Sequence, residues 1–72
     1  MRQEMTKKEK VIFDYIVGYR TARSFSPSMR EIAEAVGLRS ASTVCRHIHS
    51  LEDKGWISTN EGRSHAIIPV DD

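Results

Sequence analysis

Three side chains near the middle of the chain could perform chemistry, because thiol and imidazole groups bind metals and act as nucleophiles or bases. They are Cys45, His47 and His49. Residues four apart share a helix face, so Cys45 and His49 would point together while His47 would point elsewhere. A zinc site would need a further ligand such as His65, and a cysteine nucleophile would need an orienting carboxylate, which that face lacks. We therefore expect no metal, no cofactor and no catalytic residue.

The polar residues around Cys45 have the chemistry of a DNA-reading surface. The narrow side chains at residues 40–43 would let a helix start approach base edges closely. Hydroxyl groups can donate to phosphates or bases, Arg46 can reach guanine with two hydrogen bonds, and Cys45 can touch a thymine methyl group. The residues that we expect near base edges are Ser40, Ser42, Thr43, Cys45, Arg46 and His49.

A helix must hold this surface, and the apolar pattern predicts one that starts after Ser40 and ends at Lys54 and Gly55. Three residues at helical spacing, Val44, Ile48 and Leu51, form an apolar stripe, and we expect Ala41 beside them. His47 lies at the edge of the stripe, where a structural role is favoured over base contact. Ser40 is placed to cap the helix start, and Lys54 lies near the negative end of the helix dipole.

A shorter helix is predicted just before it, at about Met29–Val36. Ser28 and Glu31 form a capping box, and Gly37 lies where a left-handed C-terminal cap is needed. We expect Leu38, just after the turn, in the core. A short helix, a glycine turn and a second helix are typical of a helix-turn-helix, whose second helix lies in the major groove. A plain helical hairpin with a polar outer face would show the same pattern.

The N-terminal part predicts a supporting helix. Residues 1–5 are interpreted as a frayed leader, and Thr6 with Glu9 forms a second capping box. Apolar spacing predicts a helix at about Lys7–Arg20, and Gly18 indicates early fraying of its last turn.

A polar connection and a hairpin complete the expected elements. Residues 21–27 are predicted as the connection, with Phe25 in the core. Residues 56–59 and 65–68 have strand character, and residues 60–64 between them contain a turn glycine. A lone hairpin is barely stable in water, so it must pack on the helices. The side chains expected to make that contact are Trp56, Ile57 and Ile67.

Charge clusters on the chain although the net charge is only +1. Residues 20–30 and residues 39–50 hold arginines and histidines without an acid, whereas acidic residues gather elsewhere. A local basic patch can face phosphates on a nearly neutral protein. We expect Arg30, Arg39 and Arg63 to contact phosphates, although any solvated face with several arginines would look alike.

Length and composition limit the class of protein. A chain of 72 residues forms one domain, residues 1–72, with a thin core and little room for a substrate pocket. Its 39% hydrophobic and 29% charged residues suit a globular rather than a disordered chain. A single cysteine fits a reducing compartment, and no apolar run predicts a signal peptide or a membrane span. We expect a soluble cytoplasmic protein that does not bind membranes.

Three segments carry a family resemblance: FSPSMREIAEAVGLRSASTV at 25–44, HIHSLEDKGWI at 47–57 and GRSHAI at 62–67. The run from Thr6 to Val70 resembles the N-terminal DNA-binding domain of the LexA repressor family of the bacterial SOS response. The resemblance implies a mainly α (α+β) fold, a three-helix bundle with a helix-turn-helix and a two-stranded antiparallel wing. It also implies that Ser40, Ser42, Thr43, Cys45 and Arg46 read an operator half-site. The wing tip, near Gly62, Arg63 and Ser64, would contact the backbone or minor groove.

Members of that family carry a C-terminal domain with a serine-lysine self-cleavage site and the dimer interface. This chain ends at Asp72, so we expect either an excised domain or a small stand-alone protein of bacterial or phage type, without self-cleavage. The predicted function is sequence-specific binding of double-stranded DNA as a transcriptional repressor. Tight binding would need a homodimer on a palindromic site or the missing domain. The alternative is a winged-helix module that binds a repressor, polymerase or replication partner.

Overall fold

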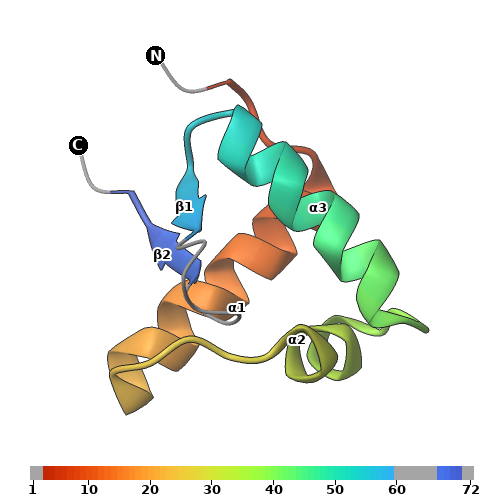
Figure 1. The fold of residues 1–72 in the computed structure, drawn as a ribbon, viewed down its shortest axis with the longest axis vertical. Coiled ribbons are helices and arrows are strands. Elements are labelled where there is room, and N and C mark those ends of the chain that lie inside the picture. Colours follow the sequence, from red (N-terminus) through yellow and green to blue (C-terminus); the bar gives the residue numbers. More distant parts are fainter. Residues whose placement is uncertain (1–2, 60–66, 71–72) are drawn as a thin grey trace.

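A computed structural model of the chain contains three helices followed by a two-stranded antiparallel sheet (Figure 1). The structure describes residues 3–59 and 67–70. The elements are α1 (Lys7–Arg23), α2 (Met29–Val36), α3 (Ala41–Asp53), β1 (Ile57–Thr59) and β2 (Ile67–Pro69). This arrangement confirms the predicted winged helix-turn-helix. No helix in the described ranges is long and apolar enough to cross a membrane.

Helix α1 begins as predicted but ends later. The Thr6 side chain accepts the Glu9 amide, and the Glu9 carboxylate accepts the Thr6 amide, so the capping box is complete. The predicted end at Arg20 is wrong, because the helix continues to Arg23 and stops at Ser24, which adopts φ 65°. Gly18 therefore lies in the helix interior, where glycine costs roughly 1 kcal/mol relative to alanine without breaking the hydrogen-bond ladder.

The connection to α2 is shorter than expected and does not bury Phe25. It starts at Ser24, whose left-handed backbone turns the chain away from α1. The prediction of a core Phe25 is wrong: its side chain is 56% exposed and lies edge-on to Tyr19, with ring centroids 5.6 Å apart. Pro27 takes the interior position instead and is fully buried.

Residues 3–5 are docked on the fold, so the prediction of a frayed leader is wrong for them. The backbone amide of Gln3 donates to the backbone carbonyl of Lys54 at 3.1 Å. The backbone carbonyl of Gln3 accepts a hydrogen bond from the indole N–H of Trp56 at 2.6 Å. The Met5 side chain packs against the core. These contacts join residues about fifty positions apart in the sequence, which no local pattern reveals.

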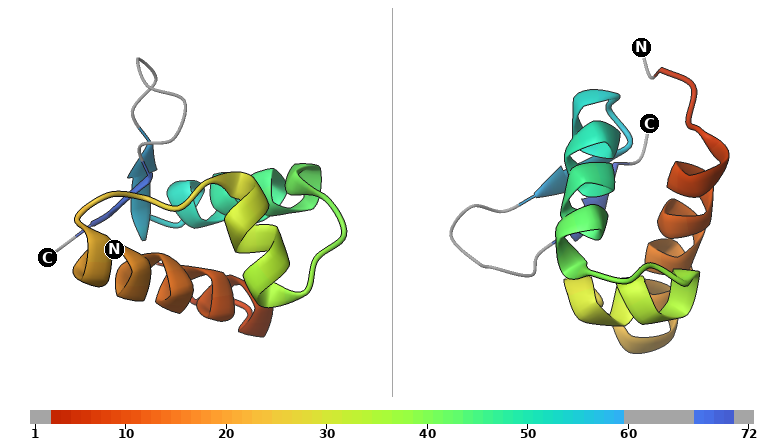
Figure 2. Two further views of the ribbon diagram at one scale, coloured as in Figure 1. Left: turned by 90° about the horizontal axis from the view of Figure 1, so that it is seen from below. Right: turned by 90° about the vertical axis from the view of Figure 1, so that its right-hand side faces the viewer.

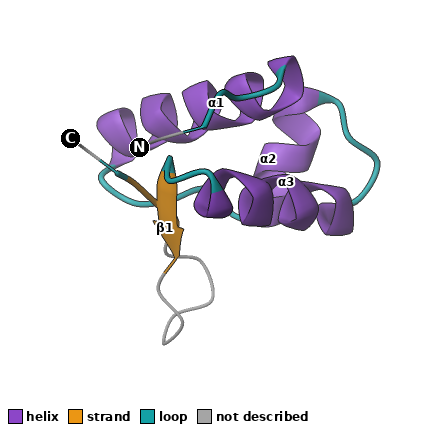
Figure 3. Ribbon diagram, turned by 90° about the horizontal axis from the view of Figure 1, so that it is seen from above, coloured by secondary structure: helices purple, strands orange, loops and turns teal. Residues whose placement is uncertain are grey.

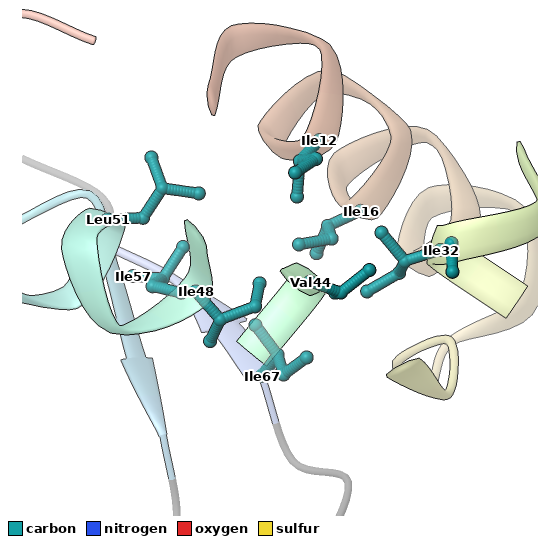
Figure 4. Close-up of a cluster of buried hydrophobic side chains, with 9 residues drawn as sticks. Ile12, Ile16, Ile32, Val44, Ile48, Leu51, Ile57 and Ile67 are labelled. Atoms are coloured by element: carbon teal, nitrogen blue, oxygen red, sulfur yellow. The ribbon is translucent and has the colours of Figure 1, made fainter. Parts of the chain in front are cut away.

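The core is built from branched aliphatic side chains of all five elements (Figure 4). Its buried members are Ile12, Ile16, Ile32, Ala33, Val44, Ile48, Leu51, Ile57 and Ile67. Each fully buried isoleucine or leucine contributes about 1.5–3 kcal/mol, which matters in so small a domain. The stripe predicted for α3 is confirmed at Val44, Ile48 and Leu51, but Ala41 is exposed rather than beside it. Ala41 is the first helical residue and projects from the turn, and Leu38 is half-buried against the core.

The strands pair with Ile57 opposite Pro69 and Thr59 opposite Ile67. The predicted packing on the helices is confirmed: Ile57 and Ile67 are buried, and Trp56 lies half-buried against Phe13 of α1, with ring centroids 5.6 Å apart. The first strand begins at Ile57, one residue later than predicted. The predicted turn at 60–64 and strand start at 65–66 lie outside the described residues. Helix α2 packs on both other helices, and β1 lies beside the end of α3 (Figures 2 and 3).

Candidate nucleic-acid interface

Helix α3 is fixed to the protein along one side and free on the other. Val44, Ile48 and Leu51 are at most 2% exposed and bind it to the core. The Ser40 hydroxyl caps its start by accepting the Thr43 amide at 3.4 Å. One turn of an α-helix takes 3.6 residues, so the side opposite the stripe is presented to solvent over the first turns of the helix.

The outer face of α3, defined here as Ser42, Arg46 and His49, is exposed. These three residues follow one another at helical spacing, so they form one continuous strip. Thr43 and Cys45 are half-buried at the two borders of the strip. The structure therefore brings together the residues that were predicted to lie near bases, with Thr43 and Cys45 less accessible than expected.

The hydroxyl groups at the start of α3 are partly engaged within the protein. The Ser40 and Thr43 side-chain oxygens lie 3.3 Å apart and share a hydrogen bond, in addition to the cap. A hydroxyl has one donor and two acceptor positions, so Ser40 has one position left and Thr43 has two. At the other end, Asp53 is exposed and falls on the same side as Arg46 and His49 by helical geometry, so the expectation that this face lacks a carboxylate is wrong. A carboxylate repels phosphate, so the usable part of the face ends at about His49.

Two arginines line a surface hollow beside the start of α3. Arg30 comes from α2 and Arg39 from the turn, and both are exposed. The lining residues are Arg30, Ala33, Glu34, Leu38, Arg39, Ser40 and Ala41. Gly37 makes this turn possible by adopting φ 80° after α2. The positive end of the helix dipole at Ser40 and two guanidinium groups together favour an anion here, against the single carboxylate of Glu34.

Glu9 anchors the far end of α3, a role that the sequence reading missed. Glu9 as a residue is 3% exposed, and its carboxylate accepts hydrogen bonds from the Lys54 ammonium at 2.6 Å, the Ser50 hydroxyl and the Thr6 amide at 2.8 Å. Burial raises the pKa of Glu9, but the hydrogen bonds from Lys54, Ser50 and Thr6 outweigh it and lower the pKa to about 2. The carboxylate is therefore charged and ties the end of α3 to the start of α1.

A second missed contact sets the position of α2. The Tyr19 hydroxyl donates to one carboxylate oxygen of Glu31 at 2.8 Å, while the other oxygen accepts the Ser28 amide at 3.0 Å. The hydrogen bonds from Ser28 and Tyr19 lower the pKa of Glu31, and the bond to Glu31 raises the pKa of Tyr19. One glutamate thus completes the capping box of α2 and fastens that helix to α1.

Three side chains considered for function lie in the part of the chain that the structure does not describe. Arg63 and Ser64 lie outside the described residues, as does His65, the third ligand considered for a metal. Within residues 3–59 and 67–70, no three His, Cys, Asp or Glu side chains gather where they could hold a metal ion. His47 is half-buried, as its place at the edge of the stripe predicted, and Cys45 carries a free thiol.

A family model described as LexA DNA binding domain matches residues 2–66 of the chain. The chain belongs to the LexA DNA binding domain family. This match confirms the family resemblance carried by residues 25–44, 47–57 and 62–67. The matched range contains all three helices and β1.

Full-length relatives show how this domain compares with longer chains. The LexA repressor of Syntrophomonas wolfei subsp. wolfei is 44% identical over 69 residues, which cover 96% of this chain and 34% of the repressor. The LexA repressor of Staphylococcus haemolyticus is 45% identical over 65 residues, covering 90% and 31%. That of Staphylococcus aureus is 43% identical over 70 residues, covering 97% and 34%. The LexA DNA binding domain described here thus spans about one third of the relatives that it matches.

Proposed function

We propose that this chain binds double-stranded DNA in a sequence-specific manner and represses transcription, with α3 in the major groove. The observation that carries the proposal is the exposed strip of Ser42, Arg46 and His49 on a helix whose opposite side is buried. Such a helix can enter the groove without disturbing the core. The relatives named LexA repressor support the assignment as a repressor.

The interface residues have two roles in this proposal. Arg46 reads a base, because its guanidinium is exposed one turn inside the helix and can bond guanine at two atoms. Ser42 and His49 flank it, and Cys45 at the border touches a thymine methyl group. Arg30 and Arg39 hold phosphates beside the start of α3, where the structure brings them together. Arg63 and Ser64 remain a sequence-based proposal for the wing.

The partner is an operator half-site, because one helix of this length covers about one half-site of a palindromic site. We infer that two copies bind together, either as a homodimer on DNA or through a further domain such as the relatives' additional length allows. The proposed role is binding rather than catalysis. The proposed location is the bacterial cytoplasm, for a protein encoded by a bacterium or by a phage.

The competing function is a protein-interaction module that binds a repressor, polymerase or replication protein. Salt dependence separates the two, because a protein that neutralises phosphates releases counterions on binding DNA. DNA affinity that falls steeply with salt supports DNA binding. Weak affinity that is almost independent of salt would support the protein partner.

Selection from a random pool of duplexes at moderate salt is the direct test. We expect one enriched motif, present as two inverted half-sites about 10 base pairs apart if two copies bind. The same selection with Arg46→Ala should lose preference at one position, whereas Lys10→Ala should not. Lys10 is a matched control because it lies on α1, 3.7 Å from Asp14, and also carries one positive charge. Failure of the wild-type chain to enrich any sequence would contradict the proposal.

A further inference from the structure

The hydroxyl group of Ser26 joins the loop before α2 to the hairpin. It donates to the carbonyl of Ile67 at 2.7 Å and accepts the amide of the same residue at 3.0 Å. It also accepts a hydrogen bond from the guanidinium of Arg20 at 2.9 Å. A serine hydroxyl has one donor and two acceptor positions, so all of them are used here.

Ser26 occupies the outer edge of β2, where a third strand would otherwise pair. Backbone groups along an antiparallel strand alternate between the two sides. The Val70 amide bonds to the Trp56 carbonyl, toward β1, so Ile67 and Pro69 direct their backbone groups to the opposite side. Pro69 has no amide hydrogen to satisfy there, and Ile67 has both its groups satisfied by Ser26. One side chain therefore does what a short strand would do at this edge.

The rest of that edge borders a surface hollow rather than another strand. The Ile67 side chain is buried in the core. Next to it, however, a surface hollow opens between α1 and β2, lined by Val17, Arg20, Thr21, Ile68 and Pro69. Apolar packing fixes the two strands at Ile57 and Ile67, whose side chains are both buried. The polar contacts of Ser26 add a constraint on the outer edge of β2, on the side facing away from β1.

The residues that follow Ser26 are fixed by burial and capping and lead directly to the helix-turn-helix. Pro27 is fully buried, and Ser28 is the N-cap of α2 with a complete capping box. Arg20 lies in α1. The hydrogen bonds of Ser26 therefore connect β2 to α1 and to the start of α2 at a single point.

We propose that Ser26 is a positioning residue for DNA binding, which holds the hairpin at a fixed orientation to α2 and α3 through its bonds to Ile67. This inference rests on the proposed function, because it assumes that the hairpin and α3 contact the same duplex. Strands β1 and β2 that are held in place in the free protein lose little orientational freedom on binding, which favours the complex. Without the hydroxyl, we expect α3 to keep its proposed base contacts and the phosphate contact proposed from the sequence for Arg63 to weaken.

A double-mutant cycle on the enriched duplex tests this positioning role. Ser26→Ala should weaken binding by roughly fivefold to tenfold, because two backbone groups and Arg20 lose their partner. Adding Arg63→Ala to Ser26→Ala should weaken binding less than twofold further, although Arg63→Ala alone costs more. Adding Arg46→Ala should cost the same in both backgrounds. A general loss of stability would affect both cycles equally, so this selective coupling distinguishes positioning from a merely structural role.

Two further variants serve as controls. Ser26→Thr keeps the hydroxyl and should bind like the wild type. Thr21→Ala removes a hydroxyl that bonds only locally, to the Val17 carbonyl at 2.8 Å, and should also leave DNA affinity unchanged. All affinities are compared at a temperature where circular dichroism shows every variant folded.

Residual dipolar couplings of the free protein give a second readout that needs no DNA. In the wild type, the couplings measured at the amides of Ser58 and Ile68 should fit the same alignment tensor as the couplings measured in α2 and α3. In Ser26→Ala they should deviate from it. Wild-type DNA affinity in Ser26→Ala, additive cycles, or unchanged couplings would each overturn the positioning role alone. A wild-type chain that binds no duplex would instead overturn the proposed function, and with it the role of Ser26 in binding.

Discussion

The ammonium group of Lys54, the C-cap residue of α3, donates to the buried carboxylate of Glu9 at 2.6 Å. The Glu9 side chain is 4% exposed and that of Lys54 20%, so water screens this ion pair little. Glu9 also closes the capping box of α1, so one carboxylate connects the end of α3 with the start of α1. The far end of α3 is thereby fixed, while its first turns remain free to reach a ligand.

Removing the ammonium group should strongly destabilise the fold. Lys54→Met keeps most of the aliphatic side chain but leaves a buried carboxylate without its counter-ion, and we expect a loss of about 3 kcal/mol. Urea unfolding at neutral pH measures it. Lys10→Met is the matched control, because Lys10 pairs with Asp14 on the exposed surface of α1, where such pairs contribute less than about 0.5 kcal/mol. Equal effects of the two substitutions would contradict the importance of the buried pair.

Glu9 should also control the stability of the domain in acid. Its pKa is about 2 in the folded protein and 4.5 ordinarily, so the folded state favours the charged form. The resulting stabilisation, about 3 kcal/mol at most, is fully present above pH 4.5 and disappears as the pH falls toward 2. Thermal unfolding between pH 7 and pH 2 should show this decline. Glu9→Gln should be less stable at pH 7 and should lose less on acidification, and an unchanged acid profile would exclude Glu9 as the cause.

Two glycines should respond to the same substitution in opposite ways. Gly18 lies inside α1, and a Cβ there would meet no atom within 4 Å, so Gly18→Ala should stabilise the fold by roughly 0.5–1 kcal/mol. Gly37 has equal space around it but adopts φ 80°, so Gly37→Ala should destabilise by about 1–2 kcal/mol. Denaturant unfolding of both variants measures the difference. Neither site is crowded, so the backbone conformation is the expected cause of the difference. If both substitutions changed the free energy of unfolding in the same direction, backbone conformation would not be the cause.

The features that could be predicted from the sequence depend on residues close together along the chain. The capping boxes of Thr6 and Ser28, the left-handed Gly37 and the stripe of α3 all follow from spacings of a few residues. The outer face of α3 followed in turn, because the residues opposite a buried stripe must be exposed. These local rules were sufficient for the three helices and the strand-forming segments, whereas the winged helix-turn-helix arrangement was implied by the family resemblance.

The features that could not be predicted join distant residues or depend on a backbone turn. Glu9 and Lys54 are 45 positions apart, and Ser26 bonds a residue 41 positions away, so no local pattern reveals either contact. Phe25 was wrongly expected in the core, because its burial depends on the turn at Ser24. Hydrophobic type alone did not reveal that Pro27 occupies the interior instead. The partners of polar residues such as Glu9 decide how the elements are fixed, and only the folded arrangement shows them.

Arg46 and Arg39 should differ in how their loss affects DNA binding. Arg46 lies on the exposed strip of α3, whereas Arg39 lines the hollow at the turn beside it. If Arg46 reads guanine, Arg46→Ala should cost about 1–3 kcal/mol on the enriched sequence and much less on random duplex, so specificity falls. Arg39→Ala should weaken binding to both duplexes about equally and reduce the slope of log affinity against log salt by about 0.9, as expected for one phosphate contact. Titrations of both duplexes at several salt concentrations measure both quantities. Equal weakening of specific and random binding by Arg46→Ala would make it a phosphate contact as well, and base reading would then fall to Ser42 and His49 on the same strip.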